Sequence, residues 1–183
     1  REPERPAGVR TVKSPFSRAE LSRLPTAYWM IVAVSAVFTL ARFSEAFLLL
    51  RAQAAGLPLA LVPSVMVVMN VVYALSAWPA GVLSDGMGRY RLLTIGFALL
   101  IVADVILAVN GSVAVVMLGV ALWGLHMGLT QGLLSAMVAD TAPAELRGTA
   151  FGVFNLVGGI ALLVASIVAG ALRQIAGPEG TFL

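Results

Sequence analysis

The sequence contains no cysteine and a single histidine, His126, and charged residues make up only 11% of its 183 residues. The lack of cysteine excludes disulfides and thiolate metal sites, and one histidine cannot form a histidine cluster. We therefore expect no metal site and no cofactor. Because an average soluble domain has about 25% charged residues, the scarcity of charge excludes an ordinary soluble globular domain.

Apolar residues make up 60% of the chain and gather in long runs. The runs are about 20 residues long, which is the length of helix that crosses the hydrocarbon core of a bilayer. They are continuously apolar rather than alternating, which excludes a transmembrane β-barrel. The sequence thus predicts an all-α membrane protein, a polytopic transmembrane helical bundle. We expect its spans at residues 27–50, 58–80, 92–109, 113–139 and 149–172.

The segments outside residues 27–172 are polar. Residues 1–26 are rich in Arg, Pro, Glu and Ser and predict a cytoplasmic loop or linker. Residues 173–183 predict an external connector into a further helix that the sequence lacks. The chain opens at Arg1 instead of Met and has an odd number of predicted spans, so we expect it to be part of a longer polypeptide.

Basic residues set the orientation of the bundle. If residues 1–26 are cytoplasmic, that side holds nine basic residues and the other side only Arg51 and Arg173, which satisfies the positive-inside rule. This role explains the net charge of +3 without a nucleic-acid partner. The bias toward Arg, Ala, Val, Leu and Gly favours a high-GC bacterial genome. We therefore expect a multi-pass protein of the bacterial inner membrane, surrounded by the lipid bilayer.

Two connecting segments carry recognisable motifs. The first is G-V-L-S-D-G-M-G-R-Y-R-L-L at residues 81–93, where glycines permit a tight turn, Asp85 can cap a helix and Arg89 can pair with a carboxylate or a helix C-terminus. The second is D-T-A-P-A-E-L-R-G-T-A at residues 140–150. The first motif is either a gating latch between two helices or simply a tight, positive-inside loop.

These motifs resemble the cytoplasmic loops of the major facilitator superfamily. The first matches the family's G-x-L-x-D-x-x-G-R-x-x-L-L loop, and the second resembles the loop before its eleventh helix. The resemblance implies that the spans are helices seven to eleven, a partial six-helix half whose partner is the missing N-terminal half of the same polypeptide. Gly86 and Tyr90 stand where the family often has basic residues. The implied cytoplasmic gating residues are Gly81, Asp85, Gly88, Arg89, Glu145 and Arg147.

Polar residues inside the spans are candidates for the transport pathway. In the first span Ser35, Thr39, Arg42 and Glu45 fall within about a third of the helix circumference at roughly 100° per residue. Arg42 and Glu45 either neutralise each other, with Arg42 snorkelling to the outer surface, or line the route, with Glu45 as a proton carrier. Both interpretations stay open.

Further candidates are Asn70 and Tyr73 in the second span, His126 near the middle of the fourth, and Asn155 in the fifth. Each has an ordinary alternative role in helix packing. In the fourth span Gly124, Gly128 and Gly132, joined by Gln131, form a small-residue face, with Trp123, His126 and Thr130 opposite.

Asp104 is a costly charge inside the third span, where functional status is the default hypothesis. Because the family's ninth helix is peripheral, the resemblance instead favours a structural pairing of Asp104, for instance with His126 or Arg51.

We expect secondary active transport of a small solute by alternating access, coupled to protons through Glu45, His126 or Asp104. Few charges and many apolar groups in the spans favour efflux of apolar or amphipathic compounds. The spans show no paired carboxylates, nucleophile motif or metal-ligand spacing, so we expect no enzyme and no catalytic residues. The alternative function is a non-transporting membrane scaffold or sensor module.

Overall fold

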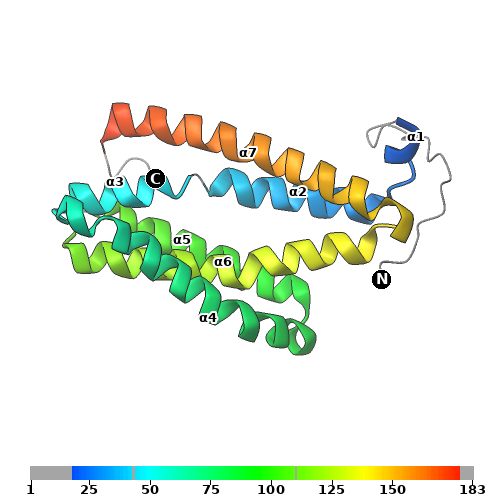
Figure 1. Ribbon diagram of the computed structural model, residues 1–183, viewed down its shortest axis with the longest axis horizontal. Coiled ribbons are helices and arrows are strands. Elements are labelled where there is room, and N and C mark those ends of the chain that lie inside the picture. The colour runs from blue at the N-terminus through cyan, green and yellow to red at the C-terminus, as the bar shows by residue number, and fades with distance from the viewer. Residues whose placement is uncertain (1–17, 43, 110, 178–183) are drawn as a thin grey trace, which may run out of the picture.

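The computed structural model describes residues 18–42, 44–109 and 111–177, and within them all regular structure is helical. The predicted all-α helical bundle is thereby confirmed. In chain order the helices are α1 (Arg18–Leu21), α2 (Thr26–Ala41), α3 (Ala46–Ala54), η1 (Leu59–Leu61), α4 (Pro63–Met87), α5 (Arg89–Ala108), α6 (Val113–Thr141), η2 (Ala144–Leu146) and α7 (Arg147–Ala176) (Figure 1).

The described residues hold five segments long and apolar enough to cross a membrane. Their bounds are Thr26–Ala54, Leu59–Met87, Arg89–Ala108, Val113–Thr141 and Ala144–Ala176. They run alternately up and down the bundle, as the short connections predict. We call the end that holds the α4–α5 turn at Gly88 the Gly88 end, and the end that holds the turn at Gly56 the Gly56 end. Most of the two predicted polar flanks, residues 1–17 and 178–183, lies outside the described residues.

The first span is broken, which the hydropathy pattern does not predict. The helix α2 ends at Ala41, Arg42 has extended backbone angles of −115° and 102°, and α3 begins at Ala46 with Glu45 as its N-cap. A cation at a helix C-terminus and an anion at a helix N-terminus both interact favourably with the helix dipoles. The two charges therefore stabilise the two ends that the break creates.

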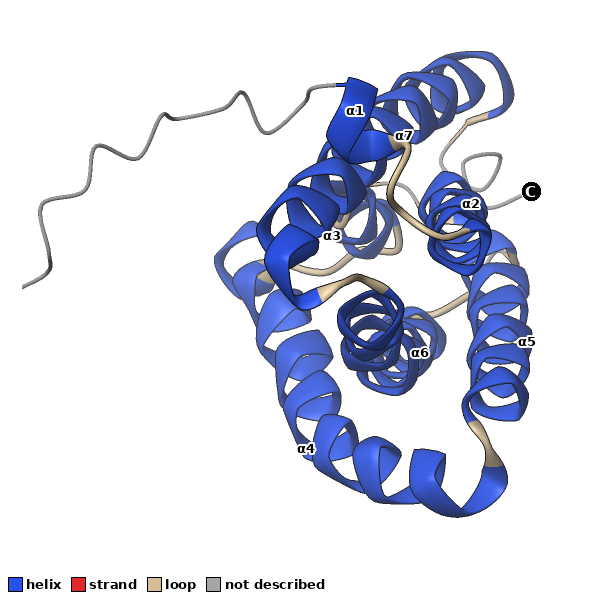
Figure 2. Ribbon diagram, turned by 90° about the vertical axis from the view of Figure 1, so that its right-hand side faces the viewer, coloured by secondary structure: helices blue, strands red, loops and turns tan. Residues whose placement is uncertain are grey.

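The helix α6 is the centre of the bundle, with α4 and α5 on its flanks (Figure 2). In its most apolar stretch 56% of the residues are buried, against 11–33% in the other spans. Glycines permit this packing. A Cβ on Gly124 would collide with the backbone carbonyl of Met69 in α4, and a Cβ on Gly128 would lie 3.0 Å from the carbonyl oxygen of Tyr73. The predicted small-residue face thus holds α4 close to α6.

The helices α2 and α7 lie side by side and form a second layer (Figure 1). The buried hydroxyl of Tyr28 joins them near the Gly88 end by donating to the carbonyl oxygen of Ala150 at 2.9 Å. The helix α3 packs on α4 and α6, and α2 also contacts α6. The broken span therefore connects the two layers.

Arg51 in α3 is buried, with 1% of its surface exposed. Its Nε donates to the carbonyl oxygen of Leu107 at 2.8 Å and its Nη2 to that of Val109 at 2.9 Å. These carbonyls end α5 and have no partner inside that helix. Arg51 thus satisfies them and fixes α3 to α5 at the Gly56 end.

The α4–α6 contact predicts a difference between two glycines of the same helix. Gly124→Ala should destabilise the protein by roughly 1–3 kcal/mol, because the added methyl forces two backbones apart. Gly132→Ala is the matched control, since a Cβ there meets nothing within 4 Å. Thermal unfolding of both variants in the same detergent checks this, and equal midpoints for the two variants would contradict the packing described.

Candidate functional site

A cavity of about 290 Å³ with both polar and apolar lining residues lies among α2, α6 and α7, near the middle of the spans. We call it the main cavity. It brings together Arg42, His126 and Asn155 of the predicted transport-pathway residues. Ser35, Thr39 and Gln131, which the sequence places on polar or small-residue faces, also line it. Phe38 and Ser135 line it too and were not predicted, although they stand at helical spacing from Ser35 and Gln131 respectively.

Arg42 lies deep in the first span. The span runs from Thr26 to Ala54, so Arg42 is two residues past its middle, or about 3 Å along the axis. The hydrocarbon extends about 15 Å to either side of its midplane. Arg42 therefore lies near the middle of its span, and its guanidinium lines the main cavity.

His126 is held in place on the wall of the main cavity. Its ring nitrogen Nδ1 lies 2.8 Å from the carbonyl oxygen of Gly96 in α5, and its ring stacks on Phe38 at a centroid distance of 6.2 Å. Because a carbonyl only accepts hydrogen bonds, Nδ1 carries the hydrogen in the neutral imidazole and Nε2 is the acceptor. Only 2% of the residue is exposed, so this tautomer is fixed by the packing of α5 on α6.

A second cavity, of about 370 Å³, adjoins the main cavity toward the Gly56 end. Its lining includes Glu45, Ser44 and Met66. Arg42 and Leu162 line both cavities and so stand between them. The pathway candidate Glu45 is therefore on the other side of Arg42 from His126 and Asn155.

The candidates on α4 lie elsewhere. Asn70 is exposed and its amide donates to the carbonyl oxygen of Met66 in its own helix. Tyr73 lines a third cavity, of about 360 Å³, between α4 and α6 toward the Gly88 end, together with Gly81, Asp85 and Arg89. The structure therefore does not bring Asn70 and Tyr73 to the main cavity.

The predicted loop motif at residues 81–93 is mostly helical. The helix α4 continues through Asp85 to Met87, seven residues beyond the predicted end at residue 80. Gly88 alone makes the turn, with φ of +84°, a conformation that favours glycine. Arg89 is the first residue of α5. Asp85 stays exposed in the last turn of α4, and no side chain caps the start of α5.

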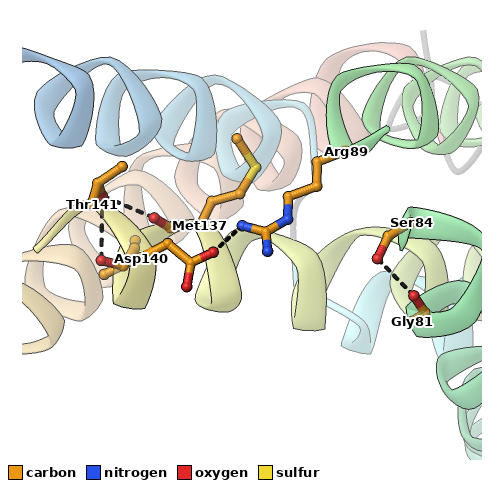
Figure 3. A network of polar contacts seen from close by, with 7 residues as sticks. Gly81, Ser84, Arg89, Met137, Asp140 and Thr141 are labelled. Carbon is orange, nitrogen blue, oxygen red and sulfur yellow. Dashed lines mark hydrogen bonds and ion pairs between the residues drawn. The ribbon is translucent and has the colours of Figure 1, made fainter. Parts of the chain in front are cut away.

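Arg89 forms an ion pair with Asp140, in the last turn of α6 (Figure 3). Asp140 opens the second motif but was not predicted as a partner. The pair joins both motifs within this chain at the Gly88 end. Glu145 in η2 and Arg147 at the start of α7 are exposed at the same end of the bundle.

Asp104 lies on α5, away from the residues that line these three cavities. Its Oδ1 is buried, and in the part of the chain that the structure describes this oxygen has no hydrogen-bond partner. Of the two expected partners, Arg51 donates to the carbonyls at the end of α5 and His126 bonds to Gly96.

Comparison with known proteins gives a consistent set of similarities. The sequence profile of the Major Facilitator Superfamily matches residues 29–183. An uncharacterised MFS-type transporter of Methanocaldococcus jannaschii is 36% identical over 176 residues, covering 91% of this chain and 43% of the relative. The chain thus spans less than half the length of this relative.

Two further relatives match over shorter stretches. Myo-inositol transporter 2 of Schizosaccharomyces pombe is 36% identical over 74 residues, 40% of this chain and 13% of the relative. The glucose transporter GlcP of Staphylococcus epidermidis is 30% identical over 101 residues, 55% of this chain and 23% of the relative. No solved structure matches the chain.

The ion pair at the Gly88 end predicts a small, salt-sensitive coupling. The side chains of Arg89 and Asp140 are 39% and 56% exposed, so a double-mutant cycle of Arg89→Gln and Asp140→Asn should give a coupling energy of about 0.2–1 kcal/mol. The coupling should fall as salt is added, because exposed charges are screened. Arg91→Gln replaces Arg89→Gln in the control cycle, where no coupling is expected. Equal couplings in the two cycles would argue against the pair.

Proposed function

This chain belongs to the Major Facilitator Superfamily, and from that premise we propose that it forms the second half, without its last helix, of a transporter that works by alternating access. The observation that carries the proposal is the main cavity, where Arg42, His126 and Asn155 meet at the middle of the spans. Substrate sites of secondary transporters lie near the bilayer midplane between structural repeats. The relatives named as transporters support transport of a solute.

The partner of this half is the N-terminal six-helix half of the same polypeptide. The length of the Methanocaldococcus relative supports this, since the chain covers only 43% of it. In this arrangement the Gly88 end faces the cytoplasm, as the basic residues indicate. The exposed Asp85, Glu145 and Arg147 then contact the other half at that end. We infer that the protein resides in a bacterial inner membrane.

The solute is small and amphipathic, it moves outward, and its transport is coupled to protons. The main cavity supports the amphipathic solute because it combines amide and hydroxyl groups with aromatic rings. Glu45 and His126 are the candidate proton carriers, since both line cavities on the proposed route. Asp104 does not line these cavities and is the weaker candidate.

Reconstitution tests the proposal. The native polypeptide that contains this chain is placed in proteoliposomes, and internal pH is recorded while solutes including myo-inositol, glucose and 2-naphthoate are added. We expect proton flux driven by at least one solute, and none with residues 1–183 alone, because the cavity needs both halves. Native polypeptide without any solute flux would favour the scaffold or sensor function, and solute uptake by residues 1–183 alone would refute the two-half arrangement.

The proposed gating role of the first motif predicts the effect of Asp85→Asn. Loss of this charge should weaken the inward-closed state, and therefore change the maximal transport rate more than the KM. Asp85→Glu keeps the charge and should behave like the wild type. Initial rates over a range of solute concentrations separate the two parameters. An altered KM with an unchanged maximal rate would place Asp85 in solute binding instead.

A further inference from the structure

We propose that the solute is an organic monoanion, a carboxylate on an apolar body, and that Arg42 binds its charge. This inference rests on the proposed function and assigns a substrate class to the main cavity. Among the described residues that line it, Arg42 is the one side chain with a permanent charge, and neither aspartate nor glutamate is among them.

Arg42 has hydrogen-bonding capacity that the described part of the chain does not use. A guanidinium has five N–H donors. Within residues 18–42, 44–109 and 111–177 the side chain of Arg42 makes no hydrogen bond and no ion pair. It is also only partly buried, so its donors face the two cavities it lines. In those cavities water, a solute or the other half of the transporter can accept hydrogen bonds from them.

Within the described residues Glu45 forms no ion pair with Arg42. It lies near enough to act on Arg42 electrostatically, but it lines the second cavity and not the main one. Each of the two charges also compensates the dipole of a half-helix end at the break. This explains why the charges are tolerated, yet it leaves the donors of Arg42 available to a ligand.

The rest of the main cavity indicates what surrounds the charge. Its uncharged hydrogen-bonding groups include Gln131, Ser135 and Asn155, and its apolar wall includes Phe38, Phe154 and Leu162. The ring of Phe38 is held between His126 and Phe97, at centroid distances of 6.2 and 5.1 Å. A solute with one charged end and one apolar body is therefore complementary to both parts of the lining.

A carboxylate fits Arg42 better than a cation or a dianion does. The planar guanidinium pairs with a carboxylate through two parallel hydrogen bonds, and such charge-assisted bonds are about twice as strong as neutral ones. A cationic solute would be repelled by Arg42. A dianion would bring a second negative charge for which this half offers no cation in the cavity.

The position of Arg42 between the two cavities also allows it to select solutes by their charge. Arg42 and Leu162 line both spaces, so a solute bound by Arg42 lies where the two cavities meet. A charge deep in the bilayer is costly unless it is paired or solvated. Binding of an anion supplies that pairing for Arg42.

The test uses three probes of one shape and different charge: 2-naphthoate, 2-naphthylmethanol and 2-naphthylmethylammonium. The native polypeptide that contains this chain is placed in lipid nanodiscs, and binding is measured by equilibrium dialysis with empty nanodiscs subtracted. We expect 2-naphthoate to bind at least about tenfold more tightly than the alcohol, with the ammonium probe weakest. Equal binding of the three probes would overturn the proposal.

Substitutions of Arg42 test whether this residue recognises the charge of the probe. Arg42→Gln should weaken 2-naphthoate binding by about tenfold or more and leave 2-naphthylmethanol within about threefold, while Arg42→Lys should retain an intermediate preference for the anion. Arg91→Gln is the control, because Arg91 is exposed and does not line these cavities. If Arg42→Gln weakens the anion and the alcohol equally, Arg42 has a structural role, such as pairing with a carboxylate of the other half, and the proposal fails.

Transport measurements separate this inference from the proposed function. Arg42-dependent binding of 2-naphthoate without any solute flux would refute the transporter and leave the anion site standing. Flux of myo-inositol or glucose that is unchanged in Arg42→Gln would support the transporter and overturn the anion site. Circular dichroism of each variant confirms that the helices are intact before the results are compared.

Discussion

The close packing of α6 against α4 and α5 is the constraint on which the rest of the structure depends. Gly124 and Gly128 allow α4 to reach the backbone of α6, and Gly96 lets α5 approach Thr130. In a bilayer such packing is a main source of helix association, because lipid tails are as apolar as the side chains. The contact fixes the rotation of α6, so that His126 and Gln131 line the space shared with α2 and α7.

The break in the first span gives that space its charge. Since α2 packs with α7 and α6 while α3 packs with α4 and α6, the span exchanges α7 for α4 as a neighbour across Arg42 and Glu45. The two charges lie at helix ends that favour them. Arg51 then ties α3 to the end of α5, so the Gly56 end of the broken span is anchored and Arg42 is left at the junction of two cavities.

Much of this arrangement follows from the sequence because hydropathy and loop chemistry are local properties. The spans, their antiparallel order and the two motifs were all predicted from runs and short patterns. The interruption at residues 42–45 was missed because it contains neither Gly nor Pro, the residues that usually mark a helix break. Asp140 was missed as the partner of Arg89 because the two are 51 residues apart, and no local pattern reports such a contact.

The sequence by itself determined that the chain is a bundle of membrane-crossing helices of a known family, since the bilayer imposes length, apolarity and internal hydrogen bonding on every span. Only the tertiary structure decided which polar residues share a cavity. Arg42, His126 and Asn155 meet there, whereas Glu45, Tyr73 and Asn70 do not line it. The physical reason is that helix rotation and the break depend on contacts between distant segments, which no single span encodes.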